Sequence, residues 1–390
     1  MHIQAKVYYV GVNDRVKHRF EGLWSLPQGV SYNSYLIADE EAVALVDTVD
    51  VAFFAEYLAH IRAIIGERPI NYLIINHMEP DHSGAISLIK KYYPEIKLVG
   101  NKKTLDMVQG FYGATSANDV MVKDGDTLSL GHHQLKFYLT PMLHWPETMM
   151  TYDETERILF SGDAFGCFGA LNGAVIDTQM DTTPYFPEME RYYATILGKF
   201  GAMVQAGLKK LAGVDIRTIC STHGPVWTAQ IPQVIETYRR LAMGETKQGL
   251  VICYGSMYGN TERVAEAIAQ GAAQAGIKKI VVHNLSVSPM SAVLTDIFRY
   301  NTLAIGAPTY NGGLFPAVDD LMKRLEERVV NKHRLALFGG FTWNSQAIKV
   351  MTAYNEKMKM ELVEPAVEWK QGAKTDVLEQ ARLLGSKLAE

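Results

Sequence analysis

The sequence has few cysteines, no long apolar run and no large excess of charge of one sign. Its three cysteines, Cys167, Cys220 and Cys253, are widely spaced, and no two of them form a CxxC pair. This pattern argues against a disulfide framework and against a four-cysteine metal site. An iron centre held by two CxxC pairs is therefore excluded from this chain, and a reducing, cytoplasmic setting fits.

The charge balance and the hydropathy exclude further classes of protein. The chain carries 38 basic and 42 acidic residues, a net charge of −4, which argues against a polybasic nucleic-acid binder or a binder of anionic membranes. No run of about 18 apolar residues is present, so no membrane span is expected. The first residues, MHIQAKVYYVGVND, lack a basic segment followed by an apolar one, so no secretory signal is expected.

The length and one polar segment indicate two domains. At about 150 residues per domain, 390 residues predict two to three. The segment 244–249 (GETKQG) is polar and bounded by glycines, as interdomain linkers often are. We therefore expect one domain at 1–247 and a second at 248–390.

The two expected domains differ in the order of their elements. Short β-rich segments and helical patterns mix in the first, whereas strands and helices alternate in the second, which predicts a doubly wound parallel sheet. In the first domain we expect strands at 6–12, 34–38, 42–46 and 71–76 and helices at 52–65, 85–93 and 188–211. In the second we expect strands at 250–254, 279–284, 301–306 and 334–338 and helices at 261–275, 290–299, 316–328, 345–359 and 374–388.

A cluster of metal-binding side chains follows the apolar strand 71–76. His77, Glu79, Asp81 and His82 place four such side chains within six residues. Loops at strand ends are where rigid scaffolds hold chemistry. The alternative is that Asp81 or Ser83 only caps the next helix and the histidines decorate a turn.

Three more strand ends offer a ligand each. His144 follows the expected strand 136–140, Asp163 follows 158–162 and His223 follows 217–222. Each residue alone reads as an ordinary turn residue, but together with the first cluster they predict one metal site. His60, His132 and His133 are not accompanied by other potential metal ligands at a strand end, and we expect them at the surface.

The first loop of the second domain has the composition of a phosphate site. Residues 255–261 (GSMYGNT) lie between the strand 250–254 and a helix, where backbone N–H groups and the helix N-terminus favour an anion. No lysine follows the glycine, so a monophosphate fits better than a nucleotide triphosphate. The alternative is an ordinary capped helix start.

Two later strand ends have the composition of an aromatic cofactor pocket. Residues 307–313 (APTYNGG) and 339–344 (GGFTWN) combine glycine, aromatic rings and amide or hydroxyl groups. In doubly wound sheets, ligands bind at these strand ends. A flat heteroaromatic ring needs stacking faces and backbone donors, and both loops supply them.

The motifs of both halves carry a family resemblance. The HxExDH run with the later His, Asp and His resembles the metallo-β-lactamase-like fold, whose hydrolases commonly show HxHxDH. Glu79 stands at the second His position. Zinc hydrolases favour imidazole-rich sites, whereas carboxylates are harder donors that suit iron. The ligand charge of −3 would reach −4 with a bridging hydroxide and would neutralise two Fe(II) ions. The second half resembles flavodoxin, which binds FMN, and the pairing resembles the flavodiiron proteins over essentially the whole chain.

The resemblance implies an αββα metallo-β-lactamase-like domain, a flavodoxin-like domain and a site for each cofactor. One iron would take His77, Glu79 and His144, the other would take Asp81, His82 and His223, and Asp163 would bridge them. FMN would be held by Ser256, Met257, Tyr258, Gly259, Asn260 and Thr261 around the phosphate and by Pro308, Thr309, Tyr310, Asn311, Gly312, Gly340, Phe341, Thr342 and Trp343 around the ring.

The implied activity is reduction of O2 to water, of NO to N2O, or of both, at a diiron site that receives electrons through FMN. The electron donor would be a separate rubredoxin-like protein or a reduced deazaflavin. A head-to-tail homodimer, or a homotetramer, is implied as well. Two alternatives stay open: a zinc-dependent hydrolase fused to a flavin domain, and a flavin electron carrier with a vestigial metal site.

Overall fold

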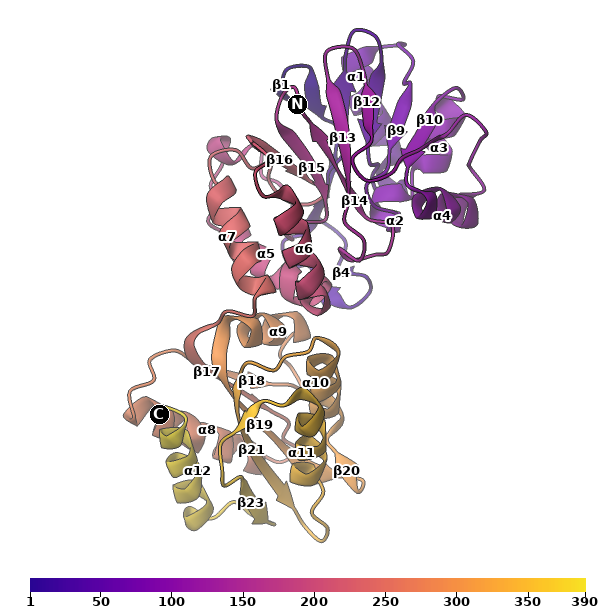
Figure 1. The fold of residues 1–390 in the computed structure, drawn as a ribbon. Coiled ribbons are helices and arrows are strands. Elements are labelled where there is room, and N and C mark those ends of the chain that lie inside the picture. The colour runs from indigo at the N-terminus through magenta and orange to yellow at the C-terminus, as the bar shows by residue number, and fades with distance from the viewer. The chain divides into compact units, whose positions relative to one another are not determined.

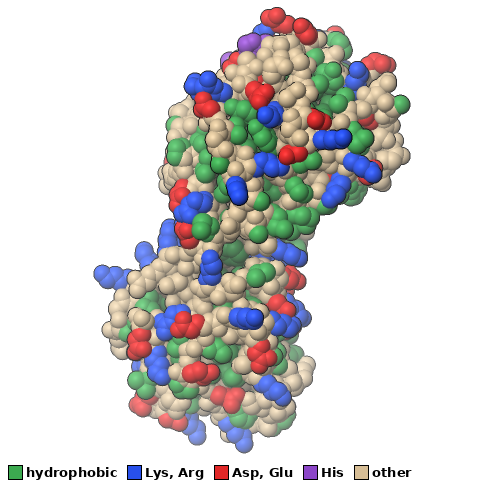
Figure 2. All heavy atoms as spheres, viewed as in Figure 1, with side chains coloured by type: hydrophobic (Ala, Val, Ile, Leu, Met, Phe, Trp, Pro, Cys, Tyr) green, Lys and Arg blue, Asp and Glu red, His purple; other side chains and the backbone are tan.

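The computed structural model describes residues 1–390, which form two compact units, Met1–Ala242 and Met243–Glu390 (Figure 1). Residue 247, the expected boundary, is the first residue of strand β17 (Lys247–Tyr254). The segment 244–249, expected to be a linker, therefore contributes its last three residues to that strand. Basic and acidic side chains are interspersed on the face seen in Figure 2, in keeping with the small net charge.

The first unit contains two sheets. One has seven strands in the order β1-β2-β7-β8-β9-β10-β11, and the other has five in the order β12-β13-β14-β15-β16. Their strands are β1 (His2–Gln4), β2 (Val7–Tyr9), β7 (Tyr35–Ala38), β8 (Val43–Val46), β9 (Tyr72–Ile74), β10 (Lys97–Gly100), β11 (Val120–Met121), β12 (Thr127–Ser129), β13 (Gln134–Leu139), β14 (Met149–Asp153), β15 (Ile158–Gly162) and β16 (Thr218–Ser221). Two small ribbons pair β3 (Val12–Asp14) with β6 (Val30–Tyr32) and β4 (Arg19–Phe20) with β5 (Trp24–Ser25).

The two sheets of the first unit pack face to face with helices outside. The ring of Tyr35 on β7 lies 5.5 Å from that of Phe160 on β15, and its hydroxyl donates to the Ser221 carbonyl of β16 at 2.6 Å. Figure 1 shows α3 (Ile86–Tyr92) and α4 (Lys102–Tyr112) on one side and α6 (Gly201–Leu211) and α7 (Ile231–Ala242) on the other. The expected αββα architecture is confirmed. The remaining helices are η1 (Val51–Phe53), α1 (Phe54–Ile65), α2 (Pro80–Ser83), η2 (Asp177–Gln179) and α5 (Tyr185–Tyr192).

The single helix expected at 188–211 is wrong, because the structure interrupts it. After α5 the chain forms a π-helical turn at Tyr193–Leu197 and a 3₁₀ turn at Gly198–Phe200, and α6 begins only at Gly201. A Cβ on Gly201 would lie 2.9 Å from the Ala242 carbonyl oxygen, so the start of α6 passes too close to the end of α7 for a side chain there. Apolar periodicity alone does not register such a break.

The expectation that His133 is a surface residue is also wrong. Its side chain is buried, with Nδ1 2.5 Å from Asp153 Oδ2 and Nε2 2.8 Å from the Ala5 carbonyl oxygen. The neighbouring His132 side chain is 57% exposed, as expected. The two neighbouring histidines, in the connection between β12 and β13, thus differ in burial.

The second unit is a parallel sheet in the order β18-β17-β19-β21-β22, with β23 also paired to β21, which confirms the expected flavodoxin-like fold. Figure 1 shows α8 and α12 on one face of the sheet and α10 and α11 on the other. The elements after β17 are α8 (Asn260–Gln274), β18 (Ile280–Asn284), α9 (Met290–Arg299), β19 (Tyr300–Tyr310), β20 (Gly313–Leu314), α10 (Pro316–Glu327), β21 (Arg334–Phe341), α11 (Ala347–Met358), β22 (Glu361–Leu362), β23 (Val367–Lys370) and α12 (Thr375–Lys387).

The sequence did not predict the edge of the sheet beyond β21. Two short strands lie there, β22 beside the start of β21 and β23 beside its end. Val367 and Trp369 of β23 are buried, while Glu368 and Lys370 are exposed. This alternation over four residues is the available strand signal, but it is shorter than a typical strand.

Across both units, no helix combines the length and the apolar character that a membrane crossing requires. All three cysteines are buried free thiols. The ends of the parallel strands carry the loops that the sequence singled out, and the sites are built there.

Candidate metal centre and cofactor pocket

The seven expected metal ligands converge from both sheets of the first unit. His77 follows β9, Glu79 precedes the short helix α2, and Asp81 and His82 lie within α2. His144 lies in the loop between β13 and β14, while Asp163 and His223 follow β15 and β16. Because β9, β15 and β16 end at the same edge of the sandwich, these side chains gather there, and all seven are buried.

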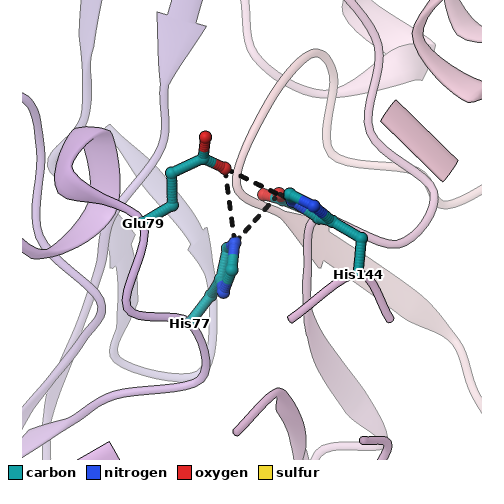
Figure 3. A group of neighbouring side chains, drawn as sticks. His77, Glu79 and His144 are labelled. Atoms are coloured by element: carbon teal, nitrogen blue, oxygen red, sulfur yellow. Dashed lines mark hydrogen bonds and ion pairs between the residues drawn. The ribbon is translucent and has the colours of Figure 1, made fainter. Parts of the chain in front are cut away.

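Two groups of ligand atoms form within this cluster. His77, Glu79, His144 and Asp163 make up the first, and their ligand atoms lie within 4.8 Å of one another. Figure 3 shows the side chains of His77, Glu79 and His144 pointing toward one point. Oε2 of Glu79 lies 3.4 Å from His77 Nε2 and 3.3 Å from His144 Nε2. This spacing leaves room for one cation among nitrogen and oxygen donors.

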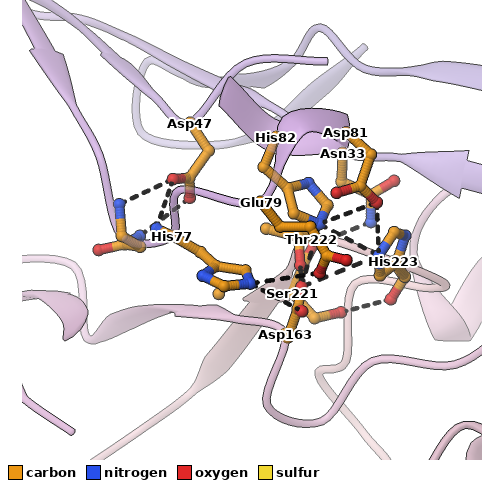
Figure 4. Close-up of polar contacts among 12 residues, drawn as sticks. Asn33, Asp47, His77, Glu79, Asp81, His82, Asp163, Ser221, Thr222 and His223 are labelled. Atoms are coloured by element: carbon orange, nitrogen blue, oxygen red, sulfur yellow. Dashed lines mark hydrogen bonds and ion pairs between the residues drawn. The ribbon is translucent and has the colours of Figure 1, made fainter. Parts of the chain in front are cut away.

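Asp81, His82 and His223 form the second group (Figure 4). Oδ2 of Asp81 lies 3.4 Å from Nε2 of both His82 and His223, and the two Nε2 atoms are 3.1 Å apart. Asn33 fixes the turn that carries His223, because its amide nitrogen donates to the carbonyls of Ser221 at 2.9 Å and Gly224 at 2.8 Å.

Asp163 lies between the two groups and presents one oxygen to each. Oδ2 is 3.1 Å from His144 Nε2 and 3.5 Å from His77 Nε2. Oδ1 is 3.0 Å from His82 Nε2 and accepts a hydrogen bond from the Thr222 hydroxyl at 2.5 Å. A carboxylate in this position suits a bridge between two cations.

The charges of the cluster shift its pKa values strongly. Burial opposes a positive charge on His82, but Asp81 and Asp163 outweigh it and raise its pKa to about 9. The pKa of His144 is likewise raised to about 9 against burial, by Asp163 and Glu79. Burial and the neighbouring His82 lower the pKa of His223 to about 4. Burial raises the pKa of Asp81 to about 7. Without metal, the cluster therefore holds protons where a cation would balance the carboxylates.

The donor set fits a pair of metal ions. His77 Nε2, Glu79 Oε2 and both Asp81 oxygens are buried and make no hydrogen bond. Buried polar atoms without partners are rare because they are costly, and metal ions would satisfy all four. Three carboxylates among the seven ligands match the harder character of iron more closely than that of zinc.

Sequence reasoning missed Glu147, a buried carboxylate behind His77. Its Oε1 lies 2.8 Å from His77 Nδ1 and accepts the Met78 N–H at 2.9 Å. Burial opposes the charge on Glu147, but the hydrogen bond from His77 outweighs it and lowers its pKa. The only sequence signal is an acidic residue three positions after His144.

Sequence reasoning also missed Tyr192, which ends α5 beside the cluster. Its ring lies 5.5 Å from that of His223, and its buried hydroxyl has no hydrogen-bond partner. Burial, with the charges of Asp163 and Glu79, raises its pKa well above the ordinary value. The hydroxyl therefore keeps its proton beside the expected metal position.

The three loops expected to hold FMN line one pocket of the second unit, of about 110 Å³. Gly259 has a φ of +84° at the start of α8, and its N–H donates to the Ser256 hydroxyl at 3.0 Å, which closes the first loop. The expected residues that line the pocket are Ser256, Met257, Tyr258, Asn260, Thr261, Pro308, Thr309, Gly340, Phe341 and Thr342.

The pocket departs from the expectation at both ends. Gly259, Tyr310, Asn311, Gly312 and Trp343 do not line it, whereas Trp369 and Gln371, from β23 and the turn after it, do. These two residues were missed because the last strand position was missed. A Cβ on Gly340 would lie 2.7 Å from the Trp369 indole, so glycine at 340 lets the ring reach the pocket.

The chain resembles known proteins over nearly its whole length. A model described as ODP family beta lactamase matches residues 30–224, and a flavodoxin model matches residues 252–385. A nitric oxide reductase of Moorella thermoacetica is 34% identical, with 98% of this chain and 96% of that protein covered. An anaerobic nitric oxide reductase flavorubredoxin of Escherichia coli is 32% identical, with 99% and 81% covered.

Solved structures agree with these relatives. The flavodiiron protein from Giardia intestinalis superimposes with a TM-score of 0.94 at 29% identity, with 98% of this chain and 94% of that chain covered. Rubredoxin:oxygen oxidoreductase from Desulfovibrio gigas gives a TM-score of 0.95 at 26% identity, with 100% and 97% covered. Fold and site thus define a two-domain flavoprotein with a metallo-β-lactamase-like metal domain.

The chain belongs to the flavodiiron protein family. It is an oxidoreductase of the flavodiiron type, whose cofactors are FMN and a pair of iron ions.

Proposed function

We propose that this chain reduces NO to N2O and O2 to water at two irons held by the seven converging ligands. His77, Glu79 and His144 would hold the first iron, Asp81, His82 and His223 would hold the second, and Asp163 would be shared between them. The division of Asp163 between two ligand groups carries this proposal, because a carboxylate that faces two cation positions suits a shared diatomic substrate.

The irons, when bound, supply the redox chemistry and the template for a diatomic molecule. The surrounding side chains provide the rest. Phe20 and Tyr192 pack their rings at 5.4 and 5.5 Å from His223 and exclude water from that side of the cluster. The Tyr192 hydroxyl holds a proton and has no protein acceptor, so it is the side chain that we assign to donate a hydrogen bond to the substrate.

FMN binds, in this proposal, in the pocket between the three loops of the second unit. The start of α8 (Asn260–Gln274) supplies free N–H groups and a partial positive charge for the phosphate. Trp369 and Phe341 offer faces for the ring. Tyr310 and Trp343 do not line this pocket. We assign them to its rim, where they contact a partner protein or the edge of the FMN ring.

Electrons reach FMN from a separate carrier, which we propose to be a rubredoxin-like protein or a reduced deazaflavin in the cytoplasm. We further propose a head-to-tail homodimer that brings the flavin of one chain beside the irons of its partner. Large side chains are exposed in both units: Tyr258 by 91% and Trp343 by 88% in the second, and Val16 by 77% and Leu23 by 56% in the first. A dimer of this kind would cover them.

Anaerobic reduction of the purified chain tests this function, with iron and FMN quantified and O2 and NO consumption measured separately. We expect two irons and one FMN per chain and turnover of both gases. The Glu79→His variant should lose iron and diatomic reduction but keep its flavin absorbance. Two zinc ions with ester-cleaving activity and no O2 or NO uptake would favour the hydrolase instead. FMN without stoichiometric iron would favour the electron carrier.

A further inference from the structure

The two ligand groups are matched in composition. Each has two imidazoles, one carboxylate of its own and one oxygen of Asp163. The ligands alone therefore give the two metal positions the same charge and the same donor types. A difference in metal affinity between the positions can therefore come from the groups that lie behind the ligands.

Behind the first group lies an additional negative charge. Glu147 accepts from Nδ1 of His77 at 2.8 Å, and its side chain is fully buried. The second hydrogen bond to Oε1, from the Met78 N–H at 2.9 Å, holds the carboxylate in place. Since a carboxylate only accepts, His77 must carry its proton on Nδ1 and offer Nε2 to the metal.

Behind the second group no carboxylate accepts a hydrogen bond from an imidazole. Nδ1 of His223 lies 2.7 Å from the carbonyl oxygen of Ser31, and Nδ1 of His82 is buried without a hydrogen-bond partner. Asp47 is a buried carboxylate nearby, but it accepts from the Asn76 amide groups and from the His77 backbone N–H. It accepts no hydrogen bond from an imidazole nitrogen of either group, and its charge acts on His82 only through space.

We propose that Glu147 is a positioning residue that makes the His77–Glu79–His144 position the tighter of the two metal positions. A buried charge acts through a low dielectric, so one extra carboxylate attracts a divalent cation more strongly than a carbonyl does. It also orients His77 and raises its basicity. Partners of this kind are typically worth about 10–100-fold in metal affinity.

The inference rests on the proposed diiron site, and iron release from the holoenzyme tests it. An Fe(II) chelator is added to the reduced protein under anaerobic conditions, and the coloured complex is followed over time. We expect two phases of equal amplitude. Glu147→Gln keeps the size and one acceptor but removes the charge, and it should accelerate only the slow phase, by about 10–100-fold. Unchanged phases, or both accelerated alike, would overturn the proposal.

Asp177→Asn is the matched control. Asp177 is also a buried carboxylate of this unit, and it accepts the N–H groups of Thr228 and Gln230 at 2.9 Å each, but it belongs to neither ligand group. It should leave both phases unchanged. Equal acceleration in Asp177→Asn and Glu147→Gln would show general loosening rather than positioning, and would also overturn the proposal.

A second measurement needs no variant and covers the case in which Glu147→Gln does not fold. Wild-type crystals are soaked in chelator until half of the metal is lost, and anomalous diffraction locates the rest. We expect the remaining metal beside His77 and His144. Metal remaining beside His82 and His223 would refute the inference. If the chain is isolated with zinc, the proposed function fails, but the same experiment still ranks the two positions.

Discussion

Nε2 of His82 lies 3.0 Å from Oδ1 of Asp163, although the two residues follow strands of different sheets. His82 belongs to the segment after β9, and Asp163 directly follows β15. The metal site is thus formed across the contact between the two sheets of the first unit. Because each sheet supplies part of both ligand groups, a well-formed site requires that the two sheets are packed together.

Replacing Asp163 with Asn should deplete both metal positions at once. The amide has no negative charge to share between two cations. Loss of a residue that only hydrogen-bonds to a metal ligand lowers metal affinity by about 10–100-fold, and we expect a larger loss of iron affinity here. Flavin content should stay unchanged, because the FMN pocket belongs to the second unit. The measurement is iron and FMN per chain after purification. Asp215→Asn, at an exposed ion pair with Arg157, is the control. Full iron loading in Asp163→Asn would refute the bridging role.

Gly340→Ala should weaken FMN binding. Its Cβ would lie 2.7 Å from the Trp369 indole, so the ring or strand β23 must move away from the pocket wall. Overpacking of this kind costs about 1–3 kcal/mol, which corresponds to a loss of roughly 5- to 150-fold in affinity. Titration of the flavin-free chain with FMN measures it.

Gly372→Ala is the control for this pocket, since a Cβ there meets no atom within 4 Å. It should bind FMN like the wild type. Equal FMN affinity in the two variants would mean that the indole is not a fixed wall of the site.

The sequence could predict this cluster of potential metal ligands because each one follows an apolar strand, either directly or within the loop or short helix behind it. That pattern is local, and it places His77, His144, Asp163 and His223 without knowledge of the packing. Glu147 and Tyr192 could not be found in this way. A buried glutamate in a loop looks like an exposed one, and Tyr192 lies inside a continuous apolar period that the π-helical turn interrupts.

Strand and helix periodicity predicted the doubly wound sheet of the second unit, whereas the αββα fold of the first was implied by the family resemblance. Periodicity missed elements where segments are short. Strands β22 and β23 have two and four residues, too few for a clear alternation. They are strands because β21 offers an edge with which to pair. The sequence did not predict that Trp369 lines the FMN pocket, because the position of β23 depends on its pairing with β21.

Helix α12 should not tolerate a side chain at Gly385. A Cβ there would lie 2.1 Å from the Ile268 carbonyl oxygen of α8, and backbone cannot yield as a flexible side chain can. We expect Gly385→Ala to lower the free energy of unfolding of the second unit by about 1–3 kcal/mol, although alanine is the better helix former. Urea unfolding followed by flavin fluorescence measures this loss.

Gly110→Ala in α4 is the matched comparison, because a Cβ there meets nothing within 4 Å. Here the helix propensity acts alone, so we expect stabilisation of the first unit by about 0.5–1 kcal/mol, measured by circular dichroism. If Gly385→Ala also stabilised its unit, that result would contradict the close packing of α12 against α8 at Gly385.

The buried pair of His133 and Asp153 should make the stability of the first unit depend on pH. Both ring nitrogens of His133 face acceptors, the Asp153 carboxylate and the Ala5 carbonyl, so both carry a proton and the ring is charged. Burial opposes this charge, but the hydrogen bond to Asp153 outweighs it and raises the pKa of His133. The unfolded pKa is about 6.5. The stabilisation is therefore complete below that pH and is lost as the pH rises through the folded pKa.

His133→Gln removes this ionisation, and His132→Gln, at the exposed neighbouring position, is its control. The free energy of unfolding of the first unit is measured for each chain from about pH 6 to 9, a range that starts near the unfolded pKa. The wild type should exceed His133→Gln by the largest margin at the acidic end, and the margin should narrow as the pH rises. His132→Gln should follow the wild type throughout. A margin that stays constant or widens toward alkaline pH would mean that the buried ring is neutral.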